Sequence, residues 1–265
     1  MKIVVCVKHV PDAQADRGFA ADTTTDRAAV DGLLSELDEY AVEEAVRLRE
    51  AGQDIEVVVL TVGPDRARDA LKKALQMGAD SAVLVSDEAI HGSDAIGTSL
   101  VLAKALEHVG FDLVVTGMAS TDGSMGVVPA MVAERLGLPQ VTYASEVTLA
   151  VGPDGAGGSV RIRRDGDAAS ETVEAALPAL VSVTDQVNEP RYPSFKGIMA
   201  AKKKPVTELG LADIGVDPAE VGTDAAWAKV VEATARPAKQ AGVVVVDSGD
   251  GAARLVDFLA AQKLV

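Results

Sequence analysis

Cysteine is almost absent from this sequence of 265 residues, which contains only Cys6. One thiol excludes an internal disulfide, and its position in an apolar run suits a reduced cytoplasmic interior. Basic residues are also scarce, since 25 Lys and Arg stand against 40 Asp and Glu, for a net charge of −15. Phosphate backbones and anionic membrane surfaces require a basic face, so we expect no nucleic-acid partner and no binding to such membranes.

Long apolar runs are missing too, and aromatic residues are scarce. The first apolar run ends at Lys8 and is therefore too short for the apolar region of a signal peptide. No other stretch approaches the roughly 18 apolar residues that are needed to span a membrane. We therefore expect a cytoplasmic protein without direct membrane insertion. Aromatic residues make up 3% of a chain that is 48% hydrophobic, so the core should consist of Ala, Val and Leu.

What the sequence does contain is a regular alternation of strand and helix patterns before residue 138. Apolar runs predict buried strands at 2–8, 54–64, 81–87 and 111–117. Apolar residues at helical spacing predict helices at 38–52, 65–80, 93–110 and 126–137, with Ser93 as the cap that starts the third and Gly78 as the cap that ends the second. This alternation predicts an α/β fold with a parallel sheet covered on both faces.

The pattern changes after residue 138. Alternating stretches at 141–151, 158–166 and 170–184 predict antiparallel strands added to the sheet, the first two joined as a hairpin by the glycine-rich turn 152–158. Beyond residue 188 the sequence is loop-like, with at most a short helix near Trp227, until an amphipathic helix at 251–265. Such a loose tail favours wrapping a partner. We therefore divide the chain into an α/β nucleotide-binding domain at 1–187 and an extended C-terminal arm at 188–265.

The loop after the fourth strand is the best candidate for a ligand site. Ligands of open parallel sheets bind at the carboxyl ends of the strands, and this loop carries Gly117, Gly123 and Gly126 before a helix. Glycines let backbone N–H groups approach a phosphate, and the helix N-terminus favours its charge. No Lys or Arg lies in the loop, so phosphate binding would depend on backbone dipoles. A nucleotide site and a bare turn fit these residues equally well.

Catalytic motifs are missing from the sequence. It has no zinc-ligand spacing, G-x-S-x-G elbow, P-loop or Cys-His arrangement, and of its three histidines His9 is the one expected near the site. These absences favour a nucleotide pocket in a protein that is not an enzyme. Two alternatives stay open. One is a nucleotide hydrolase, which would need cations or metal ligands at the phosphates, and the other is a purely structural partner-binding subunit.

The stretch "NEPRYPSFKGIMAAKKKP" at 188–205 is the most distinctive motif. Its prolines, Pro190 and Pro193, predict neither a good helix nor a central strand. The stretch resembles the signature of the beta subunit of electron transfer flavoprotein, with Asn-x-Pro-Arg-Tyr, a hydrophobic residue, an Ile-Met pair and a lysine-rich end. "VCVKHVPD", "DEYAVEEAVRLRE" and "GPDRARDALKKALQMGAD" are similar to the same family. The resemblance covers essentially the whole chain.

The resemblance implies a fold, cofactors and partners. The beta subunit of this family has an adenine nucleotide alpha hydrolase-like fold and holds a structural AMP, while an alpha subunit carries most of the FAD site. The heterodimer would accept electrons from flavin dehydrogenases, such as the acyl-CoA dehydrogenases of fatty acid β-oxidation, and pass them to a membrane quinone oxidoreductase. Carried over by position, the AMP contacts are Cys6, Ser35, Glu36, Leu37, Asp38, Val62, Gly117, Met118, Ala119, Ser120, Thr121, Asp122, Gly123, Ser124, Met125, Gly126, Val127 and Val128.

The resemblance also implies a flavin-proximal pair and a recognition loop. Arg164 and Asp165 match an Arg-acid pair near the flavin, with Asp in place of the usual Glu. The recognition loop corresponds to 183–205, and Phe195 stands where the family has a protruding hydrophobic anchor. We expect Phe195 to be exposed beside a positive patch of Arg191, Lys196 and Lys202–Lys204. The alternative is that Phe195 packs inward and the lysines are merely solvated. The residues expected to meet the partner are Arg191, Tyr192, Phe195, Lys196, Ile198 and Met199.

The nucleotide loop departs from the family patterns at three places. Residues 35–36 are Ser-Glu instead of the frequent Asn-Pro, and residues 127–129 are Val-Val-Pro instead of Gln-Thr-Gly. Residues 124–125 are Ser-Met where electron-bifurcating members, which hold a second FAD in this pocket, have Asp-Thr. We favour AMP as the nucleotide, and a second FAD or an empty pocket is the alternative.

Overall fold

The structure is a computed structural model that describes residues 1–52, 54–152, 157–234, 237–238 and 241–265. The chain forms two compact units, Met1–Val231 and Glu232–Val265. The boundary expected between residues 187 and 188 therefore lies within the first unit. Parts of two other expectations, the turn at 152–158 and the loop-like stretch beyond residue 188, fall outside the described residues.

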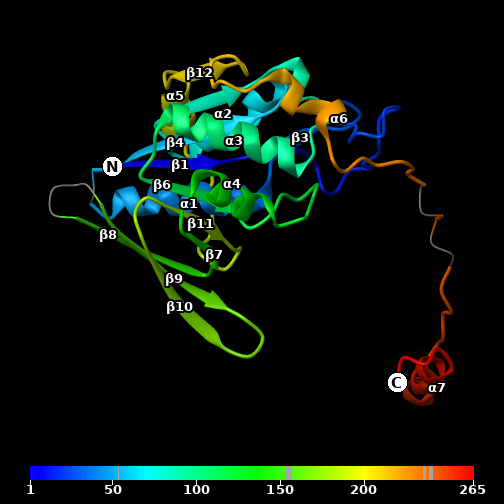
Figure 1. The fold of residues 1–265 in the computed structure, drawn as a ribbon. Helices are drawn as coiled ribbons and strands as arrows, with labels where there is room; N and C mark the ends of the chain where they lie inside the picture. The colour runs from blue at the N-terminus through cyan, green and yellow to red at the C-terminus, as the bar shows by residue number, and fades with distance from the viewer. Residues whose placement is uncertain (53, 153–156, 235–236, 239–240) are drawn as a thin grey trace. The chain divides into compact units, whose positions relative to one another are not determined.

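A central sheet of seven strands organises the first unit (Figure 1). Its order is β12-β5-β4-β1-β6-β11-β7, and all neighbouring strands run parallel. This sheet confirms the predicted α/β fold. The strands are β1 (Lys2–Cys6), β4 (Glu56–Val62), β5 (Ser81–Val85), β6 (Leu113–Gly117), β7 (Gln140–Ala144), β11 (Ala179–Val183) and β12 (Val206–Leu209).

Helices cover the two faces of this sheet and form two hydrophobic cores. Because side chains alternate along a strand, Ile3 and Val5 of β1 join one core, while Val4 joins the other. The first core includes residues of α1 (Glu36–Glu50) and α2 (Arg68–Met77), and the second includes residues of α3 (Ala95–Val109) and α4 (Val128–Leu136). The four predicted helices are thus present. Smaller elements are the antiparallel pair β2 (His9–Pro11) and β3 (Gly32–Leu34) and the 3-10 turns η1 (Asp65–Ala67), η2 (Glu88–Ile90) and η3 (Pro218–Glu220).

One predicted helix cap is wrong. Ser93 does not start α3, because the carboxylate of Asp94 accepts hydrogen bonds from the N–H groups of Ile96 and Gly97 at 2.9 and 3.0 Å. Ser93 instead donates its hydroxyl to the Ile90 carbonyl. Gly78 does end α2, as predicted, with a positive φ of 144°.

The antiparallel strands were predicted as additions to the central sheet, but they form a sheet of their own. It consists of β8 (Glu146–Val151), β9 (Gly158–Asp165) and β10 (Ser170–Ala176), which Figure 1 shows extending beyond the central sheet. The stretch predicted as one strand at 141–151 divides at Ser145, whose N–H and hydroxyl both bind the Arg163 carbonyl. The stretch at 170–184 divides at the cis Leu177-Pro178 bond, since proline cannot donate a ladder hydrogen bond. β7 and β11 therefore join the central sheet as parallel strands.

The sequence also predicted that regular structure is lost after residue 188. This prediction is wrong for most of the part of the first unit that follows that residue. A helix, α5 (Phe195–Ala201), begins directly after the prolines, because the Ser194 hydroxyl accepts a hydrogen bond from the Gly197 N–H at 3.1 Å. β12 then pairs with β5 at the sheet edge. The following segment buries Leu211, Ile214, Val216 and Val221 in the second core, before the short helix α6 (Gly222–Ala225).

The second unit contains one described helix, α7 (Gly251–Ala261), close to the position predicted for the C-terminal helix. Its apolar side chains are exposed, including Leu255 and Phe258. That this part of the chain wraps a partner stays a prediction. Across the described ranges, no helix is both long enough and apolar enough to cross a membrane.

Candidate functional site

The predicted nucleotide residues lie at the carboxyl edge of the central sheet. The strand order reverses between β1 and β6, because the chain proceeds from β1 to β4 and β5 on one side and then places β6 on the other. Ligands of open α/β sheets bind at such a reversal. Residue 8 follows β1, residues 118–127 follow β6, and residues 35–38 begin α1 nearby. The structure thus brings three separate stretches of the chain to one edge.

Gly117 marks the closest approach between two of these stretches. A Cβ atom at Gly117 would lie 2.6 Å from a carboxylate oxygen of Asp38 and 2.9 Å from the Leu37 carbonyl oxygen. Any larger residue would therefore push the loop after β6 away from the start of α1. The loop is also tied to that helix by the Ser35 hydroxyl, which accepts a hydrogen bond from the Thr121 N–H at 3.4 Å.

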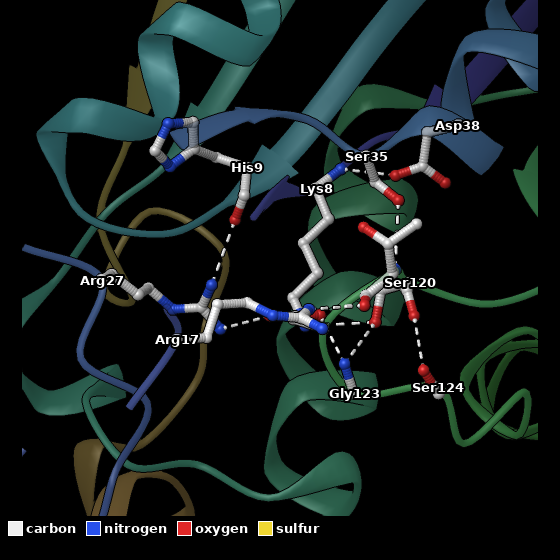
Figure 2. A network of polar contacts seen from close by, with 11 residues as sticks. Lys8, His9, Arg17, Arg27, Ser35, Asp38, Ser120, Gly123 and Ser124 are labelled. Carbon is white, nitrogen blue, oxygen red and sulfur yellow. Dashed lines mark hydrogen bonds and ion pairs between the residues drawn. The ribbon is translucent and has the colours of Figure 1, made fainter. Parts of the chain in front are cut away.

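Positive charge reaches the loop from outside it (Figure 2). Lys8 Nζ and Arg27 Nη2 each lie 2.8 Å from a carboxylate oxygen of Asp122, and Arg17 Nη1 donates to the Thr121 carbonyl at 2.8 Å. The loop itself has no Lys or Arg, as predicted, but backbone dipoles are not the only positive groups beside it. Lys8 was visible in the family-like stretch "VCVKHVPD", but nothing in the sequence spacing pointed to Arg17 or Arg27, which are 104 and 95 residues from their partners.

Two buried carboxylates in this cluster have pKa values that are shifted in opposite directions. Burial raises the pKa of Asp38 to about 7, although its Oδ2 accepts a hydrogen bond from the Lys8 N–H at 2.8 Å. Burial also opposes the charge of Asp122, but Lys8 and Arg27 hold the pKa of that carboxylate well below its usual range. Asp122 is consequently charged at neutral pH and balances part of the positive charge around the loop.

Apolar side chains border the same edge on the α3/α4 face. Cys6 and Val62, at the ends of β1 and β4, and Val128, at the start of α4, all pack against the second core. Burial raises the pKa of the Cys6 thiol to about 12, so it is neutral and behaves as a small apolar group. This face offers a surface suited to a flat apolar ring.

The loop and the end of β6 before it also contain polar groups without partners in the described part of the chain. The buried hydroxyls of Thr116 and Thr121 find no hydrogen-bond acceptor or donor among the described residues. Within the described ranges, the backbone N–H groups of Met125, Gly126 and Val127 likewise donate no hydrogen bond. Buried polar groups normally have partners, so the two hydroxyls fit a site that a polar ligand completes. Met125 and Val127 are exposed, so their N–H groups are accessible to such a ligand. The donors, the nearby cations and the apolar border together fit an adenine nucleotide.

His9 lies behind this edge and is not oriented as a ligand of it. Its side chain is buried against Gly32, where a Cβ atom would clash with the imidazole ring. Burial lowers the pKa of His9, which keeps the ring neutral. Its backbone carbonyl accepts a hydrogen bond from Arg27 Nη1 at 3.2 Å, so this residue helps to orient Arg27.

The predicted flavin-proximal residues lie elsewhere, at the end of β9, and do not pair with each other. Arg164 binds Glu171 of β10, with Nη2 2.8 Å from the carboxylate. Asp165 accepts hydrogen bonds from the hydroxyls of Ser145 and Ser170 and pairs with Arg163 at 2.9 Å. The two side chains belong to neighbouring positions of one strand, so they point to opposite faces of the sheet.

The predicted recognition residues form an exposed surface on and before α5. Tyr192 is 93% exposed and Phe195 is 80% exposed, while Ile198 and Met199 are exposed to a smaller extent. Phe195 therefore does not pack inward. The positive patch is smaller than expected, because Arg191 pairs with Glu43 and Glu50, and Lys204 donates to the Leu75 carbonyl at 2.9 Å. Lys196, Lys202 and Lys203 remain as its exposed cations among these residues.

Comparison with known proteins finds a family that matches most of this chain. Residues 22–214 match the family described as "Electron transfer flavoprotein domain". The electron transfer flavoprotein subunit beta of Mycobacterium leprae is 49% identical to this chain, with 99% of each protein covered. The subunits of the same name from Megasphaera elsdenii and Clostridium acetobutylicum are 32% and 35% identical, with 100% and 92% of each protein covered.

Proposed function

Since the chain belongs to the family of electron transfer flavoprotein beta subunits, we propose that it pairs with an alpha subunit in a heterodimer that carries electrons. The heterodimer takes electrons from flavin dehydrogenases, such as acyl-CoA dehydrogenases, and gives them to a membrane quinone oxidoreductase. In this role the chain is a carrier subunit and not a catalyst.

The nucleotide site holds one AMP. The observation that carries this proposal is the set of unpartnered polar groups, Thr116 Oγ1, Thr121 Oγ1 and the N–H groups of residues 125–127, at a carboxyl edge bordered by Lys8 and Arg27. The N–H groups and cations suit a phosphate, and the apolar border of Cys6 and Val62 suits adenine. A net positive cluster in a chain of net charge −15 is otherwise hard to explain.

FAD, held mostly by the alpha subunit, supplies the electron-carrying chemistry of the heterodimer. Arg164 and Asp165 are the residues of this chain that we place nearest to it. Their side chains are held in position by Glu171 and by Ser145 and Ser170, so they present fixed charges on β9. Fixed charges of this kind stabilise one redox state or one domain position over another.

The exposed surface of α5 is the dehydrogenase-docking surface. Phe195 and Met199 are four positions apart and therefore share one face of the helix. An exposed Phe can become the buried anchor of an interface, and it has few rotatable bonds to restrict on contact. Lys196, Lys202 and Lys203 would orient the encounter with an acidic partner.

A nucleotide hydrolase is the second candidate, and the cations beside the loop favour it. Lys8 and Arg27 supply the charge stabilisation that phosphoryl transfer requires and that the loop sequence alone lacks. Asp122 already pairs with both of them. We therefore rank the carrier subunit first and treat ATP turnover as the measurement that would reverse the order.

The test is to co-express the chain with an alpha subunit, denature the purified complex and identify the released nucleotides by mass spectrometry. We expect one AMP and one FAD per heterodimer, and a yellow complex that does not hydrolyse ATP. Two FAD and no AMP per heterodimer would show that a second flavin occupies the proposed AMP site. A colourless preparation that turns over ATP would support the hydrolase instead.

A further inference from the structure

The segment before α5 is fastened to α1 by a network of charged side chains. Arg191 donates to both carboxylate oxygens of Glu43, from Nε at 2.7 Å and from Nη2 at 2.9 Å, and its backbone N–H donates to Glu43 at 3.2 Å. Its guanidinium also reaches Glu50, with contacts of 2.7 and 2.8 Å. One arginine thus bridges two turns of the helix.

The neighbouring residue Asn188 adds a second attachment to the same face of α1. Its amide nitrogen donates to the Tyr40 carbonyl at 3.1 Å and to Glu44 at 3.0 Å. The α1 residues in contact recur at three- and four-residue spacing, which places them on one side of the helix. They are Tyr40, Glu43, Glu44, Arg47 and Glu50.

The other end of the segment is fastened to α2. Gly197 of α5 packs so closely that a Cβ atom would lie 2.5 Å from the Gln76 carbonyl oxygen. Lys204, just after α5, donates to the Leu75 carbonyl at 2.9 Å. The exposed side chains of Tyr192, Phe195 and Met199 project from a segment that is therefore held at both ends.

We propose that Glu43 and Glu50 are positioning residues, which hold α5 through Arg191 and so fix the direction in which Phe195 meets a partner. This inference depends on the proposed docking role of α5. Glu43 is suited to the task because its side chain is only 6% exposed, whereas Arg191 is 32% exposed and has no free donor edge toward a partner. The charge of Arg191 is consequently used within the chain and not at the docking surface.

The substitution Arg191→Lys distinguishes a positioning role of Arg191 from a direct effect of its charge on the partner. Lys carries the same charge but cannot bind two carboxylates with a planar fork. If Arg191 acts through position, Arg191→Lys should behave like Glu43→Gln. If Arg191 acts as a charge that the partner senses, Arg191→Lys should retain normal docking, and this result would overturn the proposal.

The experiment measures electron uptake by the co-expressed heterodimer from a purified acyl-CoA dehydrogenase. We expect Glu43→Gln and Arg191→Lys to raise the KM for the heterodimer roughly fivefold to tenfold at unchanged kcat and flavin content. Glu39→Gln is the matched control, because Glu39 lies on α1 but pairs with Lys73 of α2. In a Phe195→Ala background, Glu43→Gln should raise KM no further. An unchanged KM in Glu43→Gln, or an additive effect in that background, would overturn the proposal.

Hydrogen exchange separates this inference from the proposed docking function. Amides of α5 should exchange faster in Glu43→Gln, and also in the milder Glu50→Gln if the first variant fails to fold. An unchanged exchange rate would overturn the positioning role. If Phe195→Ala alone leaves KM unchanged, the docking proposal fails, while faster exchange of α5 in the glutamate variants still supports the attachment.

Discussion

At the residue scale, Asp38 should make stability depend on pH. Its pKa rises from 3.8 to about 7 in the folded protein because of burial. Between these values the folded state keeps a proton that the unfolded state has lost, so the free energy of unfolding should fall as pH rises, by at most about 1.4 kcal/mol per pH unit. The loss should continue through the folded-state pKa of about 7 and level off above it.

The measurement compares urea midpoints of the wild-type heterodimer and Asp38→Asn from pH 5 to 8. The substitution removes the titrating group, so its midpoint should change less over this range than that of the wild type. Glu107→Gln, which changes an exposed carboxylate of α3 paired with Lys104, is the control and should follow the wild type. Parallel profiles for the wild type and Asp38→Asn would contradict the assignment.

Gly126 is the second residue with a testable role. Its φ is 67°, and a Cβ atom there would lie 2.9 Å from the Tyr143 hydroxyl. Gly126→Glu should therefore strain the loop and place a negative charge near the phosphate, which should reduce AMP retention in the purified complex by roughly tenfold or more. No separate defect in electron transfer is expected once nucleotide and flavin contents are taken into account.

Two variants divide this effect into its parts. Gly126→Gln has the size of the glutamate without its charge, so AMP retention above that of Gly126→Glu would measure the electrostatic share. Gly166→Ala, outside the loop, is the control, because a Cβ atom at that position would meet the Ala169 carbonyl oxygen at 3.4 Å, an ordinary contact distance. Stoichiometric AMP in Gly126→Glu would show that the loop does not hold the phosphate.

At the scale of elements, α5 should act as the docking helix. Phe195→Ala should slow electron uptake from the dehydrogenase at limiting concentrations by roughly tenfold or more, because burying a phenylalanine contributes roughly 1.5–3 kcal/mol to binding. Flavin content and melting temperature should change little, since the side chain is 80% exposed. The control is Ile96→Ala on α3, which also removes a partly exposed apolar side chain. A variant that melts earlier yet accepts electrons at the normal rate would show that Phe195 stabilises the fold instead.

The elements that the sequence predicted well are those with local signals. The strands β1, β4, β5 and β6 have continuous apolar runs, and the helices between them have clear periodicity and a terminal glycine such as Gly78. β12 was missed because Val206–Leu209 is a short edge strand with mostly exposed side chains, which gives no burial pattern to recognise. α5 was missed because the two prolines dominated the interpretation, although Ser194 is an ordinary helix cap.

The site was predictable to a similar extent. The alternation of strands and helices and the glycine positions predicted that the loop lies at the carboxyl edge of the sheet, and the resemblance supplied the residue numbers. Arg17 and Arg27 could not be predicted, because they lie in an irregular segment whose path depends on tertiary contacts with Thr121 and Asp122. The network of Arg191 was hidden for the same reason, since its carboxylate partners are 141 and 148 residues away.

At the scale of the whole molecule, the C-terminal part should serve assembly. The residues at 242–265 include α7 and several exposed apolar side chains, among them Val244, Leu255 and Phe258. Deleting Gly242–Val265 should reduce the amount of alpha subunit that co-purifies, because these side chains need a surface to cover. A shorter deletion of residues 262–265, which keeps α7, is the control. Equal co-purification of the long deletion would contradict the wrapping role.

The segment that carries α5 begins after β11 and ends at β12, and these two strands stand on different sides of β1 in the central sheet. It crosses α1 and α2 on the way and contributes few residues to either core. Its ends are therefore fixed by the sheet, while its outward face is free of packing constraints. In evolutionary terms, Tyr192, Phe195 and Met199 can mutate at little cost to folding. A lineage could thus exchange one set of electron donors for another by changing this face and leave the nucleotide site untouched.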